Sequence, residues 1–178
     1  MSHNSLAVNS NEPDQAGIIT TPSVFLEIRV GGGSLSDNYS NSGASSINNS
    51  ILYFYDTNPV NTITGATLSS SNNWVSAVTL PAGTYLMEAA FSVVFSATGQ
   101  FAYQWYDGTN SRGTRAQVGG TLSHATESAS PLAVLCIELE TSTTFNVKST
   151  AASTNLESIT NHSTTPSEQS YFRIKKLS

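Results

Sequence analysis

The residues of this chain that could do chemistry are few and widely spaced. Glu138 and Glu140 form a closely spaced acidic pair, and on a strand both would lie on one face, about 7 Å apart. Two carboxylates at that separation could hydrolyse a glycosidic bond. The flanking sequence does not predict an aromatic-lined groove beside them, so a solvated strand end is the favoured interpretation.

The three histidines, His3, His124 and His162, each lack a second His or Cys at the spacing of a metal site. Cys136 is the single cysteine and cannot form an internal disulfide, and its apolar setting (LAVLCIEL) predicts a small buried side chain. There is no G-x-S-x-G nucleophile motif. We therefore predict no catalytic, cofactor or metal site, and a protein that is not an enzyme.

One aromatic strand end has the residue types of a sugar platform. Trp105 and Tyr106 could stack on a sugar ring while Asp107 accepts its hydroxyls. Aromatic residues at such a position more often belong to a core or to a subunit interface, and that is the favoured interpretation.

The composition excludes several classes of partner. Charged residues make up only 11% of the chain and the net charge is −5, so no basic stripe is present that could neutralise a run of phosphates. No apolar stretch has the length of a membrane span, and the N-terminus lacks the apolar core of a signal peptide. We expect no nucleic-acid or membrane partner, and synthesis in a cytoplasm.

Period-two alternation predicts an all-β protein. The clearest example is a hairpin over residues 74–95, with Pro81 and Gly83 in its turn. One face of its second strand would carry Tyr85, Met87, Ala89, Phe91, Val93 and Phe95. Further strands are expected at 24–30, 51–56, 101–107, 114–118, 132–140, 143–148 and 170–177, with a doubtful one at 155–159. Roughly eight to ten antiparallel strands suit a jelly-roll β-sandwich.

The chain divides into two parts. Residues 1–22 are polar and interrupted by prolines, which predicts an extended N-terminal arm that needs a partner to become ordered. Residues 23–178 form the predicted jelly-roll domain. The arm carries four apolar side chains that we predict to contact a neighbouring protein: Leu6, Val8, Ile18 and Ile19.

The turn LPAGTY at residues 80–85, the aromatic strand FAYQWYD and the closing strand at 171–177 resemble the jelly-roll modules of tailed-bacteriophage virion proteins. These modules are similar to the tumour-necrosis-factor fold and are typically trimeric. The resemblance covers roughly residues 67–177 and implies a capsid decoration protein, a head fibre or a fibre tip. Many fibre modules carry a basic, histidine-containing segment after the long strand, and residues 97–104 lack one.

The interpretation we favour is a decoration or cement protein that binds and stabilises the lattice of the major capsid protein. It would be a homotrimer on the outer surface of the virion. The predicted trimer interface consists of the large apolar residues of three strands: Tyr103, Trp105, Leu135, Ile137 and Phe172.

The alternative is a receptor-binding fibre or spike tip that recognises a host surface glycan. It would use loops 31–50 and 108–115, with Trp105 or Tyr106 as the stacking platform. Glycan binding by the isolated domain would distinguish this alternative from the decoration protein.

Overall fold

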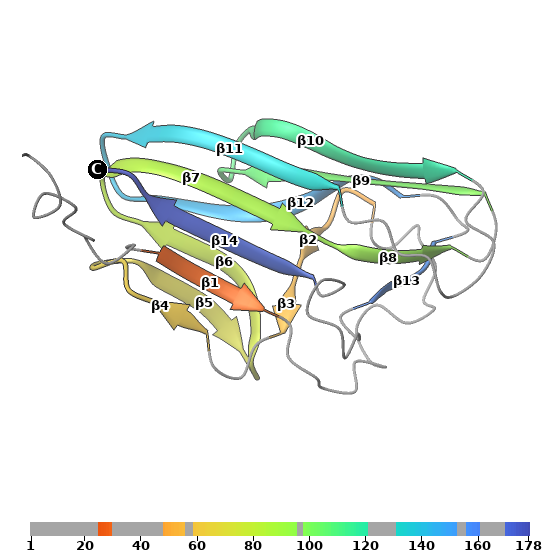
Figure 1. Ribbon diagram of the computed structural model, residues 1–178, viewed down its shortest axis with the longest axis horizontal. Helices are drawn as coiled ribbons and strands as arrows, with labels where there is room; N and C mark the ends of the chain where they lie inside the picture. Colours follow the sequence, from red (N-terminus) through yellow and green to blue (C-terminus); the bar gives the residue numbers. More distant parts are fainter. Residues whose placement is uncertain are drawn as a thin grey trace, which may run out of the picture.

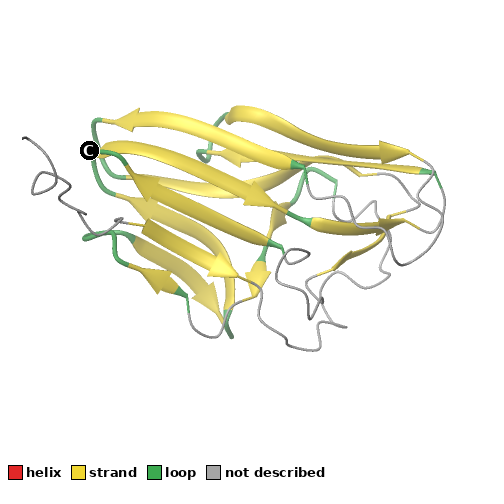
Figure 2. Cartoon of the chain, viewed as in Figure 1, coloured by secondary structure: helices red, strands yellow, loops and turns green. Residues whose placement is uncertain are grey.

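The computed structural model describes residues 25–29, 48–55, 59–95, 98–120, 131–152, 156–160 and 170–178. They form fourteen β-strands and, within these ranges, no helix (Figure 2). The strands build two packed antiparallel sheets and one short strand pair (Figure 1). The all-β jelly-roll prediction is confirmed. The residues predicted to form the arm lie outside the described part of the chain.

The first layer is a five-stranded sheet. Its order is β11 (Leu132–Leu139), β7 (Gly83–Ala90), β14 (Tyr171–Lys176), β1 (Phe25–Arg29) and β4 (Val60–Asn61). The closing strand β14 therefore lies between β7 and β1, and its Ile174 is opposite Met87 on one side and Leu26 on the other. All three side chains are buried, so the register places one apolar row against the other layer.

The second layer is a seven-stranded sheet. Its main path is β10 (Ser111–Gly120), β9 (Gly99–Tyr106), β12 (Thr143–Ala152), β6 (Trp74–Leu80) and β3 (Phe54–Tyr55). Two further strands extend it, since β2 (Ile51–Leu52) pairs with β12 and β5 (Thr67–Ser71) pairs with β6. The separate pair consists of β8 (Ser92–Phe95) and β13 (Leu156–Thr160).

The core between the layers is aromatic. Every residue of the predicted period-two face from Tyr85 to Phe95 is buried, as are Phe101, Tyr103 and Trp105 from the other sheet. Phe91 is central, with its ring 4.5 Å from that of Phe54 and 4.9 Å, edge-on, from that of Tyr103. The alternation read from the sequence thus identifies the inward faces of both sheets.

The predicted hairpin over residues 74–95 is wrong. β6 and β7 lie in different sheets, and the turn between them is an arch from one layer to the other. Tyr85 donates its hydroxyl hydrogen to the carbonyl oxygen of Pro81 at 3.0 Å, which fixes the arch. The end of the chain closes against it, because Thr84 N donates to Ser178 O at 3.1 Å and Leu177 N donates to Thr84 O at 2.8 Å. The turn residues Pro81 and Gly83 suit a hairpin and an arch equally well, so the sequence does not distinguish these two connections.

Several predicted strand boundaries also change. The strand expected at 51–56 is split into β2 and β3, which pair with different neighbours. The long strand after the arch is divided at Phe91, where the chain leaves β7 and enters β8. These interruptions raise the number of strands above the expected eight to ten without changing the architecture.

One side of the sandwich is closed where β10 meets β11. Thr114 bridges the two sheets, with Val134 N donating to Thr114 Oγ1 at 2.8 Å and the hydroxyl donating back to Val134 O at 3.3 Å. Gly113 permits this approach: its φ is +73°, and a Cβ there would clash with the carbonyl oxygen of Val134 and lie 2.9 Å from Leu135 Cβ. The sheet edge of β11 is thereby partly covered.

Candidate functional site

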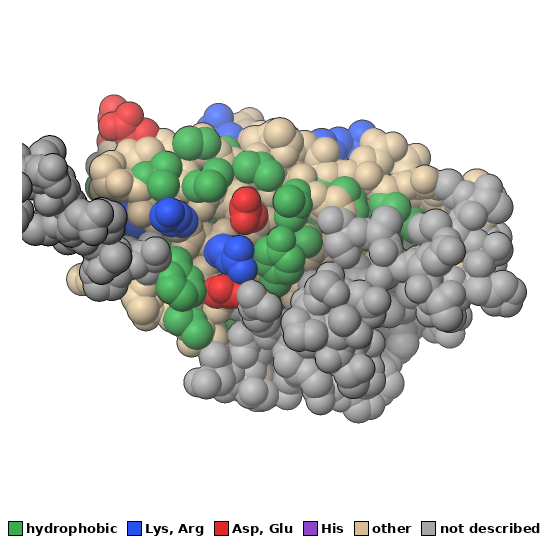
Figure 3. Space-filling view, in the orientation of Figure 1, with side chains coloured by type: hydrophobic (Ala, Val, Ile, Leu, Met, Phe, Trp, Pro, Cys, Tyr) green, Lys and Arg blue, Asp and Glu red, His purple; other side chains and the backbone are tan. Residues whose placement is uncertain are grey.

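The candidate site is the outer face of the five-stranded sheet, which turns away from the core. Its side chains lie in cross-strand rows set by the register. One row carries Phe25, Lys175, Leu86 and Cys136; the next carries Glu27, Arg173, Glu88 and Val134; a third includes Tyr171, Ala90 and Leu132. Figure 3 views the molecule from this side and shows hydrophobic side chains around a small group of acidic and basic ones.

Arg173 is the electrostatic centre of this face. It stands between Glu27 on β1 and Glu88 on β7, and its Nη2 lies 3.3 Å from Glu27 Oε1. The hydrogen bond to Glu27 raises the pKa of Arg173, and the charge of Glu88 adds to the effect. The Glu27 side chain is only 14% exposed. A partly buried, hydrogen-bonded ion pair of this kind fixes orientation at an interface more than it adds affinity.

A shallow hollow of about 300 Å³ lies beside the ion pair, lined by Phe25, Glu27, Arg173 and Lys175. It combines one aromatic wall with charges of both signs. Beyond Leu86 and Val134 the face continues to Leu132, which is 44% exposed. The face therefore offers apolar area, a hollow and an ordered ion pair, which are the components of a protein–protein contact surface.

The residues predicted for the trimer interface lie elsewhere. Tyr103, Trp105, Leu135 and Phe172 are buried inside the sandwich of a single chain, and Ile137 packs against the same core. The four buried side chains are already covered and are not available to a second copy, and Ile137 is partly covered. The physical reason is that Tyr103, Trp105 and Phe172 lie on the core-facing sides of their strands, whereas β11 is apolar on both faces, so its sequence does not show which face turns inward.

Cys136 is the other correction. It was expected to be buried but is exposed, on the outward side of β11, while its neighbour Leu135 takes the core position. With Val134 and Leu132 it makes the outward side of β11 apolar. Residues 132–137 are apolar on both faces of the strand. This pattern also suits a subunit interface, and it was the sequence signal for this surface.

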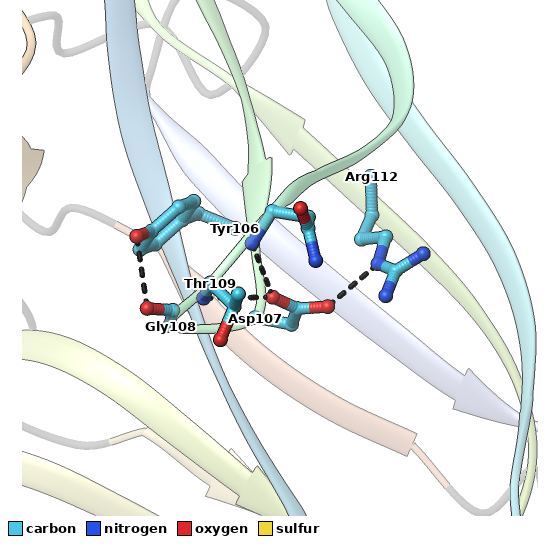
Figure 4. Close-up of polar contacts among 6 residues, drawn as sticks. Tyr106, Asp107, Gly108, Thr109 and Arg112 are labelled. Atoms are coloured by element: carbon cyan, nitrogen blue, oxygen red, sulfur yellow. Dashed lines mark hydrogen bonds and ion pairs between the residues drawn. The ribbon is translucent and has the colours of Figure 1, made fainter.

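The turn after β9 does not form a sugar platform. Trp105 is buried, and its Nε1 donates to Ala133 O at 3.2 Å. Asp107 is occupied within the turn, accepting hydrogen bonds from Asn110 N at 2.6 Å, Thr109 N at 2.9 Å and Arg112 Nε at 2.6 Å (Figure 4). These donors, Asn110 first, lower the pKa of Asp107 to about 2. Tyr106 donates its hydroxyl hydrogen to Gly108 O at 2.8 Å.

The remaining chemical candidates add no site within the described residues. Glu138 lies near the end of β11, Glu140 follows the strand, and both are exposed. The described ranges contain no group of three or more His, Cys, Asp or Glu side chains that could hold a metal ion. They also contain no helix that is long and apolar enough to cross a membrane. The histidines and the four predicted arm contacts lie outside these ranges.

Two packed sheets, an inter-sheet arch and a closing strand beside β7 define an all-β jelly roll. The solved structure of Eiger TNF from S. frugiperda is similar, with a TM-score of 0.50 and 15% identity over 88% of this chain and 94% of that one. Murine APRIL gives a TM-score of 0.47 and 14% identity over 87% and 98%. No protein-family profile matches the sequence, and no curated protein does. At such identity the similarity to Eiger shows the fold alone.

Proposed function

We propose that this protein is a non-enzymatic structural subunit of a bacteriophage virion. It forms a homotrimer on the outer surface of the capsid, where it binds and stabilises the assembled lattice of the major capsid protein. The observation that carries the proposal is the outer face of the five-stranded sheet, with its apolar rows around the Glu27–Arg173 pair. Such a face is suited to a second copy of the chain.

The character of that face supports the proposed trimer. Apolar side chains of Phe25, Leu86 and Val134 would be buried in the contact, while Arg173 and Tyr171 are residue types enriched at interface centres. In a ring of three copies, this face would contact a different surface of the next copy. Head-to-tail contacts of this kind close into a ring when the rotation between subunits is one third of a turn.

In the proposed capsid role, binding shifts the equilibrium between free capsid subunits and the assembled lattice toward the lattice. A protein that binds the assembled lattice and not the free subunits stabilises the lattice in proportion to its binding free energy. Three copies held together bind with a higher effective concentration than one. The contact in this proposal is made by the arm at residues 1–22, whose apolar side chains are Leu6, Val8, Ile18 and Ile19.

The test is co-sedimentation with undecorated capsids. We would compare the full chain with a version that starts at Ser23, after showing by sedimentation equilibrium that both have the same oligomeric state. The expected result is binding by the full chain and loss of binding by the shortened one. Equal binding by both would refute the arm contact, and binding by neither would refute the decoration role.

A salt series in the same assay tests the nature of the contact. Because only 11% of the residues are charged, lattice binding should rest on apolar contacts and backbone hydrogen bonds. Salt at 0.5 M shortens the screening length well below the roughly 10 Å of 0.1 M salt, yet bound protein should stay with the capsid. Release by moderate salt alone would contradict an apolar contact.

A further inference from the structure

The outer face of the seven-stranded sheet carries a second surface of different chemistry. Five side chains on three adjacent strands form it, and we refer to them as the cationic patch: Gln104, Tyr106, Arg115, Lys148 and Thr150. Lys148 is directly opposite Gln104 in the β12–β9 register. Arg115 belongs to the bulge of β10, and its side chain reaches across to β12. The patch is therefore continuous across β10, β9 and β12.

Contacts within the patch hold its polar groups in place. Lys148 Nζ lies 4.4 Å from the centre of the Tyr106 ring, a cation–π contact. Arg115 Nε donates to Thr150 Oγ1 at 3.0 Å, and Gln104 Nε2 donates to Gly113 O at 2.7 Å. Each long side chain is thus positioned before any ligand arrives, which lowers the entropic cost of binding.

The two cations of the patch have no carboxylate partner in the described part of the chain. Its two ion pairs are Arg112 with Asp107 and Arg173 with Glu27, and neither includes Lys148 or Arg115. The carboxylates of Glu27, Glu88 and Glu138 belong to the outer face of the other sheet. Within the described residues, a chain with net charge −5 therefore presents two positive charges without a carboxylate partner on one polar sheet face.

The chemistry of the patch indicates the kind of ligand. None of the large exposed hydrophobic side chains of the described residues (Tyr53, Val60, Leu132 and Leu177) belongs to β9, β10 or β12, so the patch lacks the apolar centre of a protein interface. It offers instead an amide, a hydroxyl, a guanidinium and an ammonium group. Lys148 and Thr150 are two residues apart on β12, whose register is irregular between Ser149 and Ala151.

We propose that the cationic patch binds an acidic saccharide. Carboxylates of uronic-acid units contact Lys148 and Arg115, and ring hydroxyls hydrogen-bond to Gln104 and Thr150. This site differs from the loop platform considered from the sequence, because Tyr106 holds Lys148 in place instead of stacking on the sugar. The proposal is independent of capsid binding and would hold for a free protein.

The test is calorimetric titration of the full chain with trigalacturonate, with its methyl ester as the uncharged probe. We expect trigalacturonate to bind and the ester to bind at least tenfold more weakly. Lys148→Gln and Arg115→Gln should each weaken binding of trigalacturonate by about tenfold, since each removes one charge-assisted contact. Both positions are on the surface of the sheet, and circular dichroism would verify that the variants fold.

Lys176→Gln is the matched control, because it removes the same charge at the end of β14, in the other sheet and outside the residues of the proposed contact face. It should leave trigalacturonate binding unchanged. Weakening equal to that of Lys148→Gln would show attraction by overall charge and overturn the proposal. Equal affinity for acid and ester, or no binding of trigalacturonate at millimolar concentration, would overturn it as well.

Discussion

At the residue scale, the absence of a Cβ atom at Gly113 allows β10 to approach β11 and close one side of the sandwich. Its φ of +73° and the neighbouring backbone of β11 leave no room for a Cβ. Gly113→Ala should therefore separate β10 from β11 and break the bonds of Thr114 to Val134. We expect a loss of roughly 3 kcal/mol in the free energy of unfolding, measured by urea denaturation.

Gly108→Ala provides the control for that substitution. Gly108 also has a positive φ, +90°, but an added Cβ would meet no atom within 4 Å. Only the backbone conformation is penalised, so the loss should be about 1 kcal/mol. Equal losses for the two variants would show that the close approach to β11 contributes nothing beyond the φ angle.

Asp107 gives the fold a specific acid sensitivity. Its pKa is lowered from 3.8 to about 2, chiefly by the hydrogen bond from Asn110 N, with Arg112 and Thr109 N contributing. A carboxylate whose folded pKa is depressed adds stability that is complete above its unfolded pKa and lost as the pH falls through the folded one. The contribution of Asp107 should thus fade between about pH 4 and pH 2.

Asp107→Asn tests this contribution. The variant should be less stable at pH 7 by about 1 kcal/mol, because the turn loses charge-assisted hydrogen bonds. Its midpoint of urea unfolding should approach that of the unmodified chain as the pH falls toward 2. A difference that stays constant from pH 7 to pH 2 would contradict the role of the Asp107 charge.

At the element scale, one hydroxyl group joins three strands. Tyr103 on β9 accepts a hydrogen bond from Phe91 N, at the break between β7 and β8, at 2.9 Å. The same hydroxyl donates to Pro131 O just before β11. Burial raises the pKa of Tyr103, which keeps the group neutral and able to donate. The positions of β8 and β11 relative to β9 therefore depend on this side chain.

Tyr103→Phe should cost about 2 kcal/mol, because it leaves the buried amide of Phe91 and the carbonyl of Pro131 unpaired. Tyr85→Phe is the comparison: it removes one bond to Pro81 O in a part-buried turn, and about 1 kcal/mol is expected. Thermal and urea unfolding of both variants would check the order. A smaller loss for Tyr103→Phe would mean that water satisfies the freed groups.

The sequence predicts where the strands lie better than it predicts which strands pair with one another. Alternation from Tyr85 to Phe95 identifies six core side chains, because a period of two is a local property of the backbone. The arch between β6 and β7 was predicted as a hairpin, since residues 81–83 suit either connection. Which sheet a strand joins depends on distant residues, such as those of β14, that reach β7 only in the folded chain.

The candidate site is less predictable for a related reason. In residues 132–137 both faces are apolar, and the sequence alone does not show that Leu135 turns inward and Cys136 outward. The ion pair of Glu27 with Arg173 joins residues 146 positions apart. Only the register between β1 and β14 brings them together, and local patterning contains no signal for it.

At the scale of the whole molecule, the two outer faces have opposite characters. The five-stranded sheet presents apolar rows around a half-buried ion pair, whereas the seven-stranded sheet presents polar side chains with two cations that have no carboxylate partner among the described residues. This asymmetry suits an assembly in which one face is covered by a neighbouring copy and the other stays in solvent. The proposed trimer uses the outer face of the five-stranded sheet, and the proposed saccharide site uses the outer face of the seven-stranded sheet. Separate variants can therefore test the two proposals.

Leu86→Asp tests the covered face. Leu86 lies on the outer face of the five-stranded sheet beside Lys175 and Cys136, with its side chain outside the core. A carboxylate there would be desolvated against apolar side chains of a neighbouring subunit, which opposes association much more than folding. We expect sedimentation equilibrium to show a trimer for the unmodified chain and a monomer for the variant, with the same circular dichroism spectrum.

Gln117→Asp is the matched control, because it adds the same charge at an exposed position of β10 on the outer face of the seven-stranded sheet. It should leave the trimer intact. A trimer that survives Leu86→Asp, or an unmodified chain that is already monomeric, would remove the outer face of the five-stranded sheet as the subunit interface. Loss of the trimer in both variants would indicate that added negative charge anywhere opposes association, since the chain already carries a net charge of −5.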